Sequence, residues 1–421
     1  MPSSRVAIVG AGSTYTPELI DGFARLRDTL PIDELVLIDP AADRLRPIAA
    51  LARRIFAKQG HSARISTAAT VADGAVDADA VLIQLRVGGQ TTRRDDETWP
   101  LQCGCVGQET TGAGGLAKAL RTVPVVLEIA EQVRRANPDA WIVDFTNPVG
   151  IVTRALQSAG HKAVGLCNVA IHLQRKFADS LGVPPESVRL EHVGLNHLTW
   201  ERGVTVGGRD VLPELLDRFG AKIAEDVEIP LALIRHLGAV PSYYLKYYYR
   251  HDAVVEELQA SGPRADQVAE IERRLLDMYA DPALDTKPAL LGERGGAYYS
   301  EAAVQLVAAL LGTGGGSVQV VNTRNDGVLP FLPDDAVIEV PAQVDPEGVR
   351  PLPQRPVESR YSGLIAHVTA YEHLALEAAL RGGRGRVFDA LLAHPLVGQY
   401  ELAERLTDEL VLHNRAYLSW A

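Results

Sequence analysis

The chain begins with a short apolar segment that leads directly into two glycines and then into a helix. Residues 5–9 have strand character, Gly10 and Gly12 form a turn, and Pro17 suits the first turn of the following helix. Strand, tight turn and helix make the opening unit of a parallel sheet, and the turn leaves backbone N–H groups free to face a pyrophosphate. Tyr15 stands where the usual fingerprint has its third glycine. The same residues also fit a turn that binds nothing.

The first half of the chain repeats this pattern of buried strand and helix. Further strands are predicted at residues 35–38, 80–83, 141–145 and 163–166. Helical segments separate them. This alternation is typical of an α/β fold with a Rossmann-like, doubly wound parallel sheet.

Polar residues follow the predicted strands at the edge where such sheets bind ligands. Ser13 and Thr14 follow the glycines of the first turn, and Arg86 comes shortly after the strand at 80–83. Asp39 ends the second strand, where a carboxylate accepts hydrogen bonds from a ribose diol and repels a 2′-phosphate, so NAD is favoured over NADP. Asn147 follows the strand at 141–145 and fits either a helix cap or a ligand contact.

From about residue 175 the pattern changes to longer helices with fewer strands. Helices are predicted at residues 231–249, at 265–279 and from 361 onward, and strands at 317–322 and 336–340. A chain of 421 residues is long enough for two lobes. We expect an NAD-binding Rossmann-like domain at residues 1–170. A mostly helical α+β domain at residues 171–421 is expected to contribute substrate and metal binding and oligomerisation.

Composition argues against several kinds of partner. The formal net charge is -11, whereas nucleic-acid binding requires basic surface. No uncharged apolar run approaches the ~20 residues that a membrane-spanning helix needs, and the N-terminus leads into a strand instead of a signal sequence. Three cysteines are too few for a disulfide framework and fit a reducing compartment. We expect a cytoplasmic protein with no nucleic-acid or membrane partner, assembled as a homodimer or homotetramer.

A cysteine and a histidine are candidate ligands for a catalytic metal. Cys167 follows the strand at 163–166, and His197 lies in a Gly-Leu-Asn-His sequence that is typical of a tight turn. A thiolate and a neutral imidazole suit a first-row transition metal, and two protein ligands leave positions open for substrate oxygens. His172 and His192 compete with His197 for this role. A buried structural cysteine and a core histidine are the alternatives.

Tyrosines and arginines provide further candidates. Residues 241–249 hold five of the thirteen tyrosines, most of which are expected to pack between the lobes. One of them is a candidate base, because a nearby metal ion would favour the phenolate. Arg86 and Arg93 could hold phosphate oxygens in a bidentate way, whereas Arg94 is expected to be solvated. The glycine-rich loop at 107–115 is expected to form an active-site wall.

Seven motifs together resemble glycoside hydrolase family 4, and the resemblance extends from about residue 5 to residue 310. The motifs are GAGSTYTP (10–17), RVGG (86–89), GQETTG (107–112), TNP (146–148), CN (167–168), GLNH (194–197) and RGGAYYS (294–300). Members with Cys-Asn at the metal site are similar to 6-phospho-β-glucosidases, whereas α-specific members tend to carry Cys-Asp. The resemblance therefore implies activity on a phosphorylated β-glucoside.

The resemblance also implies roles for individual residues. It makes Cys167 and His197 the ligands of a divalent metal, expected to be Mn²⁺. It makes Tyr244 the base, with Glu109 raising the basicity of the tyrosine. It implies that the substrate contacts are Arg93, Asn147, Asn168 and Arg294, with Asn168 also at the catalytic position. Gly10, Gly12, Ser13, Thr14, Asp39 and Arg86 are expected to contact NAD.

The family mechanism differs from hydrolysis by two carboxylates. It implies transient oxidation of carbon 3 by NAD, removal of the carbon 2 proton by Tyr244, elimination of the aglycone, addition of water and return of the hydride. Three alternatives stay open from the residues: a simple NAD-dependent dehydrogenase of sugars or hydroxy acids, an NAD-sensing protein without catalysis, and a family 4 glycosidase acting on an α-linked or non-phosphorylated sugar.

Overall fold

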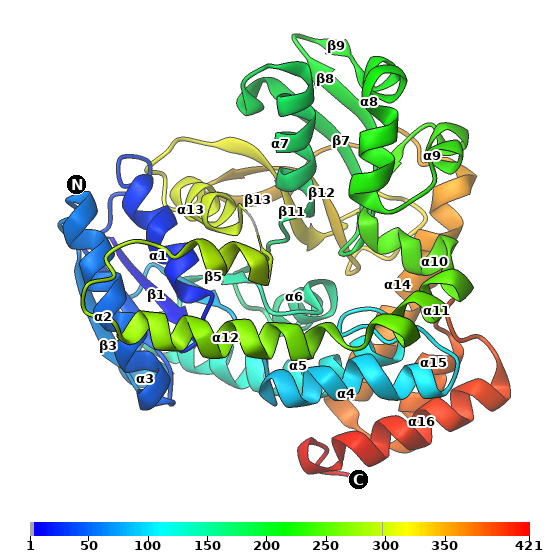
Figure 1. Cartoon of the computed structure of the whole chain (residues 1–421), viewed down its shortest axis with the longest axis horizontal. Helices are drawn as coiled ribbons and strands as arrows, with labels where there is room; N and C mark the ends of the chain where they lie inside the picture. Colours follow the sequence, from blue (N-terminus) through cyan, green and yellow to red (C-terminus); the bar gives the residue numbers. More distant parts are fainter. Residues whose placement is uncertain (1–3, 297) are drawn as a thin grey trace.

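A nine-stranded mixed sheet forms the centre of the computed structural model, which describes residues 4–296 and 298–421 (Figure 1). Ala297 of the RGGAYYS motif and residues 1–3 lie outside the described residues. The strand order is β13 (Gly348–Pro351), β12 (Val337–Asp345), β11 (Ser317–Arg324), β6 (Ala163–Gly165), β5 (Trp141–Asp144), β4 (Ala80–Ile83), β1 (Arg5–Val9), β2 (Glu34–Ile38) and β3 (Arg64–Ala68). The six strands from β6 to β3 are parallel, which confirms the Rossmann-like, doubly wound fold predicted from the sequence.

Alternate residues of the central strands face two hydrophobic layers. Val6 and Ile8 of β1 pack with helices α1 (Thr16–Arg25), α2 (Ala42–Gln59) and α13 (Tyr299–Leu310). Ala7 and Val9 pack on the opposite face with α5 (Gly112–Ala136) and α6 (Val149–Ser158). Because both faces are covered, these strands are apolar throughout, as expected of a buried parallel sheet. The covered sheet fixes the positions of the loops at its carboxyl edge.

One expectation about secondary structure was wrong, and one strand of the parallel sheet was missed. The sequence suggested one helix over residues 231–249, but Gly238, with φ of 69°, ends α9 (Leu231–Leu237). A short strand β10 (Val240–Pro241), the 3-10 turn η2 (Tyr243–Leu245) and α10 (Lys246–Tyr249) follow. The edge strand β3 was missed because its sequence, RISTA, contains only one strongly apolar side chain and is mostly solvent-accessible.

A second, antiparallel sheet holds one of the candidate ligands. Strands β7 (Val188–Leu195) and β8 (Leu198–Val206) pair through Leu195 and Leu198, so that Asn196 and His197 form the two-residue turn. His197 has φ of 63°, a conformation that non-glycine residues adopt rarely. Gly194 is required beside this turn, because a Cβ there would lie 2.0 Å from the Leu198 carbonyl oxygen. The hairpin therefore holds His197 in a defined orientation.

The C-terminal half returns to the first sheet. Strand β11 pairs antiparallel with β6 through Asn322 and Gly165, and β12 and β13 extend the sheet from there. The division at residue 170 stays a prediction, and the central sheet is continuous across it. Helices α14 (Ser359–Arg381), α15 (Arg384–Leu392) and α16 (Tyr400–Asn414) form the orange and red part of Figure 1. Among the described residues, no helix is long and apolar enough to cross a membrane.

Candidate active site

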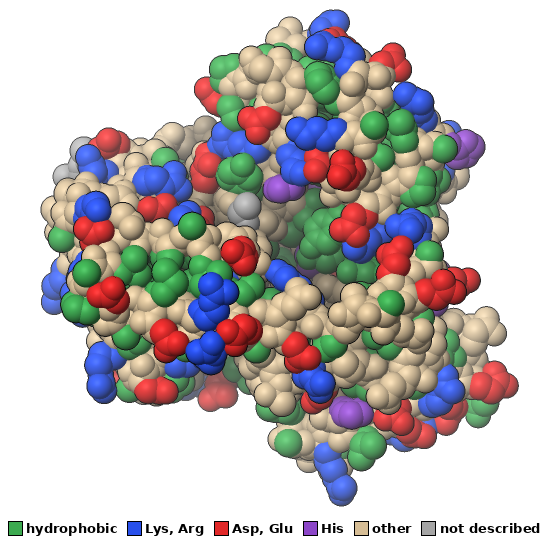
Figure 2. Space-filling model, in the orientation of Figure 1, with side chains coloured by type: hydrophobic (Ala, Val, Ile, Leu, Met, Phe, Trp, Pro, Cys, Tyr) green, Lys and Arg blue, Asp and Glu red, His purple; other side chains and the backbone are tan. Residues whose placement is uncertain are grey.

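A cleft of about 1620 Å³ opens beside the carboxyl ends of the parallel strands. Its walls come from the glycine turn after β1, from α7 (Val169–Leu181) and α8 (Leu212–Val227), and from α12 (Arg264–Ala280). Figure 2 shows the surface hollowed between the region of α7 and α8 and that of α12. Nine Lys and Arg side chains line the cleft, against five Asp and Glu. The cleft of this acidic chain is therefore suited to anionic ligands.

Most of the residues predicted from the sequence line this cleft. They are Gly10, Gly12, Ser13, Asp39, Arg86, Arg93, Glu109, Asn147, Asn168, Tyr244 and Arg294. Thr14, Cys167 and His197 do not belong to the lining. Thr14 is fully buried, and its carbonyl oxygen accepts a 2.7 Å hydrogen bond from Tyr279. Thr14 thus anchors the glycine turn to α12, away from the open space of the cleft.

The glycine turn and Asp39 form one end of the cleft. Gly10 has φ of 82°, and a Cβ there would lie 2.3 Å from the carbonyl oxygen of Gln84. A Cβ on Gly12 would lie 2.8 Å from the carboxyl carbon of Asp39. The Asp39 carboxylate accepts hydrogen bonds from the Gly12 N–H at 2.8 Å and the Ala41 N–H at 2.9 Å. The backbone therefore approaches the carboxylate closely and holds it at the end of β2. The glycine turn and this carboxylate together fit the pyrophosphate and the ribose of NAD.

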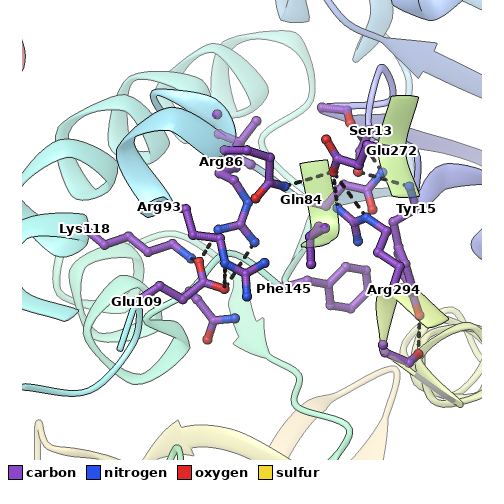
Figure 3. A pocket seen from close by; sticks show the side chains of 18 of the residues that line it. Ser13, Tyr15, Gln84, Arg86, Arg93, Glu109, Lys118, Phe145, Glu272 and Arg294 are labelled. Atoms are coloured by element: carbon purple, nitrogen blue, oxygen red, sulfur yellow. Dashed lines mark hydrogen bonds and ion pairs between the residues drawn. The ribbon is translucent and has the colours of Figure 1, made fainter. Parts of the chain in front are cut away.

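Arg294 lies at this nucleotide end of the cleft. It donates two hydrogen bonds to Glu272, at 3.3 and 3.0 Å, and its guanidinium carbon is 5.6 Å from the centre of the Tyr15 ring. The Tyr15 hydroxyl in turn donates to the carbonyl oxygen of Gly296. In Figure 3, Phe145 lies between this group and the group around Glu109. The sequence did not point to Glu272, because its partner is 22 residues away on a different element.

Glu109 lies at the centre of a cluster of three cations on the other side of Phe145 (Figure 3). Its carboxylate pairs with Arg86, with Arg93 at 3.3 Å and with Lys118 at 2.8 Å. Burial acts to raise the pKa of Glu109, but the three cations hold that pKa well below its usual range. Burial lowers the pKa of Lys118 to about 8. Sequence reasoning missed Lys118, although a lysine in the apolar first half of α5 was a usable signal.

Tyr244 stacks on the candidate ligand His197. The two ring centres are 3.5 Å apart and the planes are inclined by 10°. The Nδ1 atom of His197 is 3.1 Å from the hydroxyl of Thr110, and burial lowers the pKa of His197 to about 4, so the imidazole is neutral at pH 7. Burial raises the pKa of Tyr244 well above its ordinary value. A neutral imidazole next to the phenol is the form that can bind a metal.

Cys167 is buried at the carboxyl end of β6, next to the N-terminus of α7. Burial raises the pKa of its thiol, while hydrogen bonds from the Val169 N–H, the Asn196 side chain and Tyr299 act in the opposite direction. Within residues 4–296 and 298–421, no group of three or more His, Cys, Asp and Glu side chains could hold a metal ion. The donor set therefore fits a cation that takes its remaining ligands from the substrate and water, as expected for a Lewis acid.

The competing histidines have other surroundings. His192 is fully buried between Glu201, at 2.6 Å from its Nδ1, and Glu339, at 3.0 Å from its Nε2. Both ring nitrogens are thus occupied by carboxylates. His172 lines the cleft from α7, and its ring centre is 6.2 Å from that of Tyr298.

Asn147 and Asn168 lie on the cleft wall between the two ends. The side-chain oxygen of Asn147 is buried and has no hydrogen-bond partner among the residues that the structure describes. Since buried polar atoms are normally paired, this oxygen is suited to receive a donor from a ligand. Asn168 immediately precedes α7 and also lines the cleft.

A parallel sheet of this strand order, with a glycine turn and an acidic residue after the second strand, is the architecture of dinucleotide-binding enzymes. The model of the family 4 glycosyl hydrolases matches residues 5–183, and the model of their C-terminal domain matches residues 192–397. The chain therefore belongs to glycosyl hydrolase family 4 and is a glycoside hydrolase, as the sequence motifs predicted.

Similar proteins have been characterised or solved in several bacteria. The chain is 36% identical to the probable 6-phospho-beta-glucosidase of Bacillus subtilis (strain 168), over 98% of this chain and 97% of the relative. A structure of the 6-phospho-beta-glucosidase of Thermotoga maritima with NAD and glucose-6-phosphate has a TM-score of 0.93 and 34% identity, over 99% of both chains. A 6-phospho-alpha-glucosidase from gut microorganisms, in complex with NAD and Mn²⁺, has a TM-score of 0.89 and 26% identity, again over 99% of both chains.

Proposed function

We propose that this chain is an NAD- and manganese-dependent 6-phospho-β-glucosidase. The observation that carries the proposal is the Cys167–Asn168 pair, which lies at the carboxyl end of the sheet next to a cleft that begins at the nucleotide turn. Relatives named 6-phospho-beta-glucosidase are 34% to 36% identical to this chain, whereas two relatives named as phospho-alpha-glucosidases are 25% and 26% identical. This difference favours the β-linked substrate.

The residues of the cleft would hold both cofactors. The turn of Gly10 and Gly12 would receive the pyrophosphate and Asp39 the adenosine ribose, while Cys167 and His197 would hold the cation. When bound, NAD supplies a reversible hydride acceptor for carbon 3 of the sugar, and Mn²⁺ supplies a Lewis acid for the oxygens on carbons 2 and 3.

The other residues would bind the sugar and move a proton. Arg93 and Asn147 would orient the substrate, with Arg294 approaching from the nucleotide end and Asn168 from the start of α7. Once carbon 3 is a ketone, Tyr244 would remove the acidic proton on carbon 2. The electron pair of that C–H bond forms a double bond to carbon 1 while the bond from carbon 1 to the aglycone oxygen breaks. Tyr244 is favoured as the base because its ring contacts His197 directly.

The proposed role of Glu109 has two parts. The family resemblance makes it a residue that raises the basicity of Tyr244. Its ion pairs with Arg86, Arg93 and Lys118 support a further role, in which it holds these cations on the cleft wall. We expect Arg86 to contact NAD. Because it also pairs with Glu109, it would lie where the nucleotide end of the cleft meets the substrate end.

An assay with four substrates tests this proposal. Purified protein is supplied with Mn²⁺, NAD and a thiol reductant, and offered aryl α- and β-glucosides with and without a 6-phosphate. We expect aglycone release from the 6-phospho-β-glucoside without net formation of NADH, and loss of that activity with EDTA. Steady accumulation of NADH without aglycone release would instead indicate a simple dehydrogenase. Cleavage of an unphosphorylated or α-linked substrate alone would assign a different family 4 specificity.

The assembly and location of the protein are part of the same proposal. We propose a cytoplasmic homodimer or homotetramer, with residues 1–170 as the nucleotide domain and 171–421 as the domain for substrate, metal and self-association. Three buried free cysteines support a reducing compartment. Exposed apolar side chains on α14 (Leu380) and α16 (Tyr400 and Leu412) support contact between copies. Light scattering during size-exclusion chromatography measures the assembly state.

A further inference from the structure

A buried polar network lies behind the two candidate metal ligands. Its centre is Glu339 on β12, whose carboxylate accepts hydrogen bonds from Asn196 and Asn322, both at 2.9 Å, and lies 3.0 Å from the Nε2 of His192. His192 in turn contacts Glu201 on β8 at 2.6 Å. The side chains of His192, Glu201, Asn322 and Glu339 are all removed from water. Three strands of two different sheets, β7, β11 and β12, and the turn between β7 and β8 thus meet at one carboxylate.

Asn196 connects this network to both candidate ligands. Its side-chain amide donates to Glu339 and also acts as a hydrogen-bond donor that opposes the rise in the pKa of the Cys167 thiol. Its backbone directly precedes His197 in the turn between β7 and β8. A rotation of Asn196 would therefore disturb the hydrogen bond to the sulfur and the peptide that orients the imidazole. Cys167 and His197 are 30 positions apart in the chain, and Asn196 joins them through one side chain.

Glu339 also places negative charge behind the site. Burial acts to raise its pKa, but hydrogen bonds from His192, Asn196 and Asn322 hold that pKa below its ordinary value, so the group is a carboxylate at neutral pH. Its charge acts on Cys167 and on His197 through space. A buried anion next to a thiol and an imidazole favours a cation between them, and residues in this outer position commonly orient metal ligands.

We infer that Glu339 and Asn196 are positioning residues of the divalent-metal site, which hold Cys167 and His197 in register and supply the compensating charge behind them. This inference rests on the proposed function, because it assumes that Cys167 and His197 are the ligands. Neither residue belongs to the lining of the cleft, so their effect should appear in metal affinity before it appears in catalysis. Loss of such outer partners typically weakens metal binding about 10- to 100-fold.

The test measures Mn²⁺ affinity directly in wild type, Glu339→Gln, Asn196→Ala and Glu201→Gln. Glu339→Gln removes the carboxylate charge behind Asn196 with little change of shape, and Asn196→Ala removes the bridge. Glu201→Gln is the matched control, because it alters a carboxylate of the same network. Glu201 contacts the Nδ1 of His192, whereas Glu339 contacts the Nε2 on the opposite side of the ring. Calorimetric titration gives the Mn²⁺ and NAD dissociation constants, and thermal unfolding confirms that each variant is folded. The thiolate-to-metal absorption band of the Co²⁺ form reports on coordination by Cys167.

We expect the Mn²⁺ dissociation constant to rise about 10- to 100-fold in Glu339→Gln and Asn196→Ala, with NAD affinity unchanged. The cobalt–thiolate band should shift or weaken in these two variants, and Glu201→Gln should stay within about threefold of wild type. The inference would be overturned if Glu339→Gln and Asn196→Ala bound Mn²⁺ as tightly as wild type, or if both and Glu201→Gln lost Mn²⁺ affinity equally. Either result would leave the metal site itself in place. A wild-type protein that binds no Mn²⁺ would refute the proposed function, and the inference with it.

Discussion

Replacement of Gly12 by alanine should weaken NAD binding. The φ angle of Gly12 lies outside the left-handed region, so alanine meets no backbone strain there. Its methyl group, however, would lie 2.8 Å from both the carboxyl carbon and Oδ2 of Asp39, which is several tenths of an ångström too close. The Asp39 side chain must therefore move, and in moving it weakens the hydrogen bonds from Gly12 and Ala41 that now fix it.

The size of the effect follows from the contact between Asp39 and the ribose. A hydrogen bond to a charged group is worth about 1.5–3 kcal/mol, and the displaced carboxylate should lose about one such bond to the ribose. At 1.4 kcal/mol for each factor of ten, we expect NAD affinity to fall about 10- to 100-fold in Gly12→Ala. Isothermal titration with NAD measures the dissociation constant, and thermal unfolding without NAD measures stability.

Gly363 provides a matched control for this substitution. It lies within α14, and a Cβ there would have nothing within 4 Å. Gly363→Ala should therefore bind NAD like wild type and should be at least as stable, because alanine favours a helix. If Gly12→Ala retained an NAD dissociation constant within about twofold of wild type, a difference below 0.5 kcal/mol, our placement of the nucleotide against Asp39 would be refuted.

Three further predictions concern the metal, the cation cluster and pH. Cys167→Ser should abolish Mn²⁺-dependent cleavage and weaken Mn²⁺ binding in calorimetry, with NAD binding unchanged; full activity would argue against the metal assignment. Glu109→Gln should lower the free energy of unfolding by about 3–5 kcal/mol, because one buried and two partly buried cations lose their shared carboxylate. Glu214→Gln, at the surface, should leave the free energy of unfolding close to that of wild type in the same urea titration. Burial raises the pKa of Asp144 to about 8, from an ordinary value of 3.8. Between these values the folded state retains a proton that the unfolded chain has released, so wild-type stability falls as pH rises, and above pH 8 this fall ends. The melting temperature of Asp144→Asn minus that of wild type should increase from pH 5 to pH 8. A difference that stays constant over this pH range would contradict this reasoning.

The parallel part of the fold could be predicted because its signals are local. Each central strand is an apolar run that ends at a polar or glycine position, and the carboxyl ends of such strands meet at one edge. The sequence therefore predicts that the Gly10 turn, Asp39, Asn147 and Cys167 surround one site. The turn at His197 was predicted in the same way, from a short Gly-Leu-Asn-His sequence.

Interactions between distant segments could not be predicted in this way. Glu109 meets cations from three separate elements, and Arg294 is held by Glu272 of a neighbouring helix. No periodicity in the sequence encodes such pairings. Thr14 was expected to face the cofactor because it belongs to the turn, but it packs against Tyr279. The tyrosine-rich segment reads as part of one helix in the sequence, but Gly238 adopts a left-handed conformation that ends α9 before it.

The central claim is that cleavage proceeds through removal of the carbon 2 proton, and isotope exchange tests this claim most directly. An aryl 6-phospho-β-glucoside is hydrolysed in D₂O with Mn²⁺ and NAD, and the glucose 6-phosphate formed is analysed by proton NMR. The account predicts deuterium at carbon 2 of the product, because the proton taken by Tyr244 exchanges with solvent before it is replaced. Complete hydrolysis with no deuterium at carbon 2 would contradict the account.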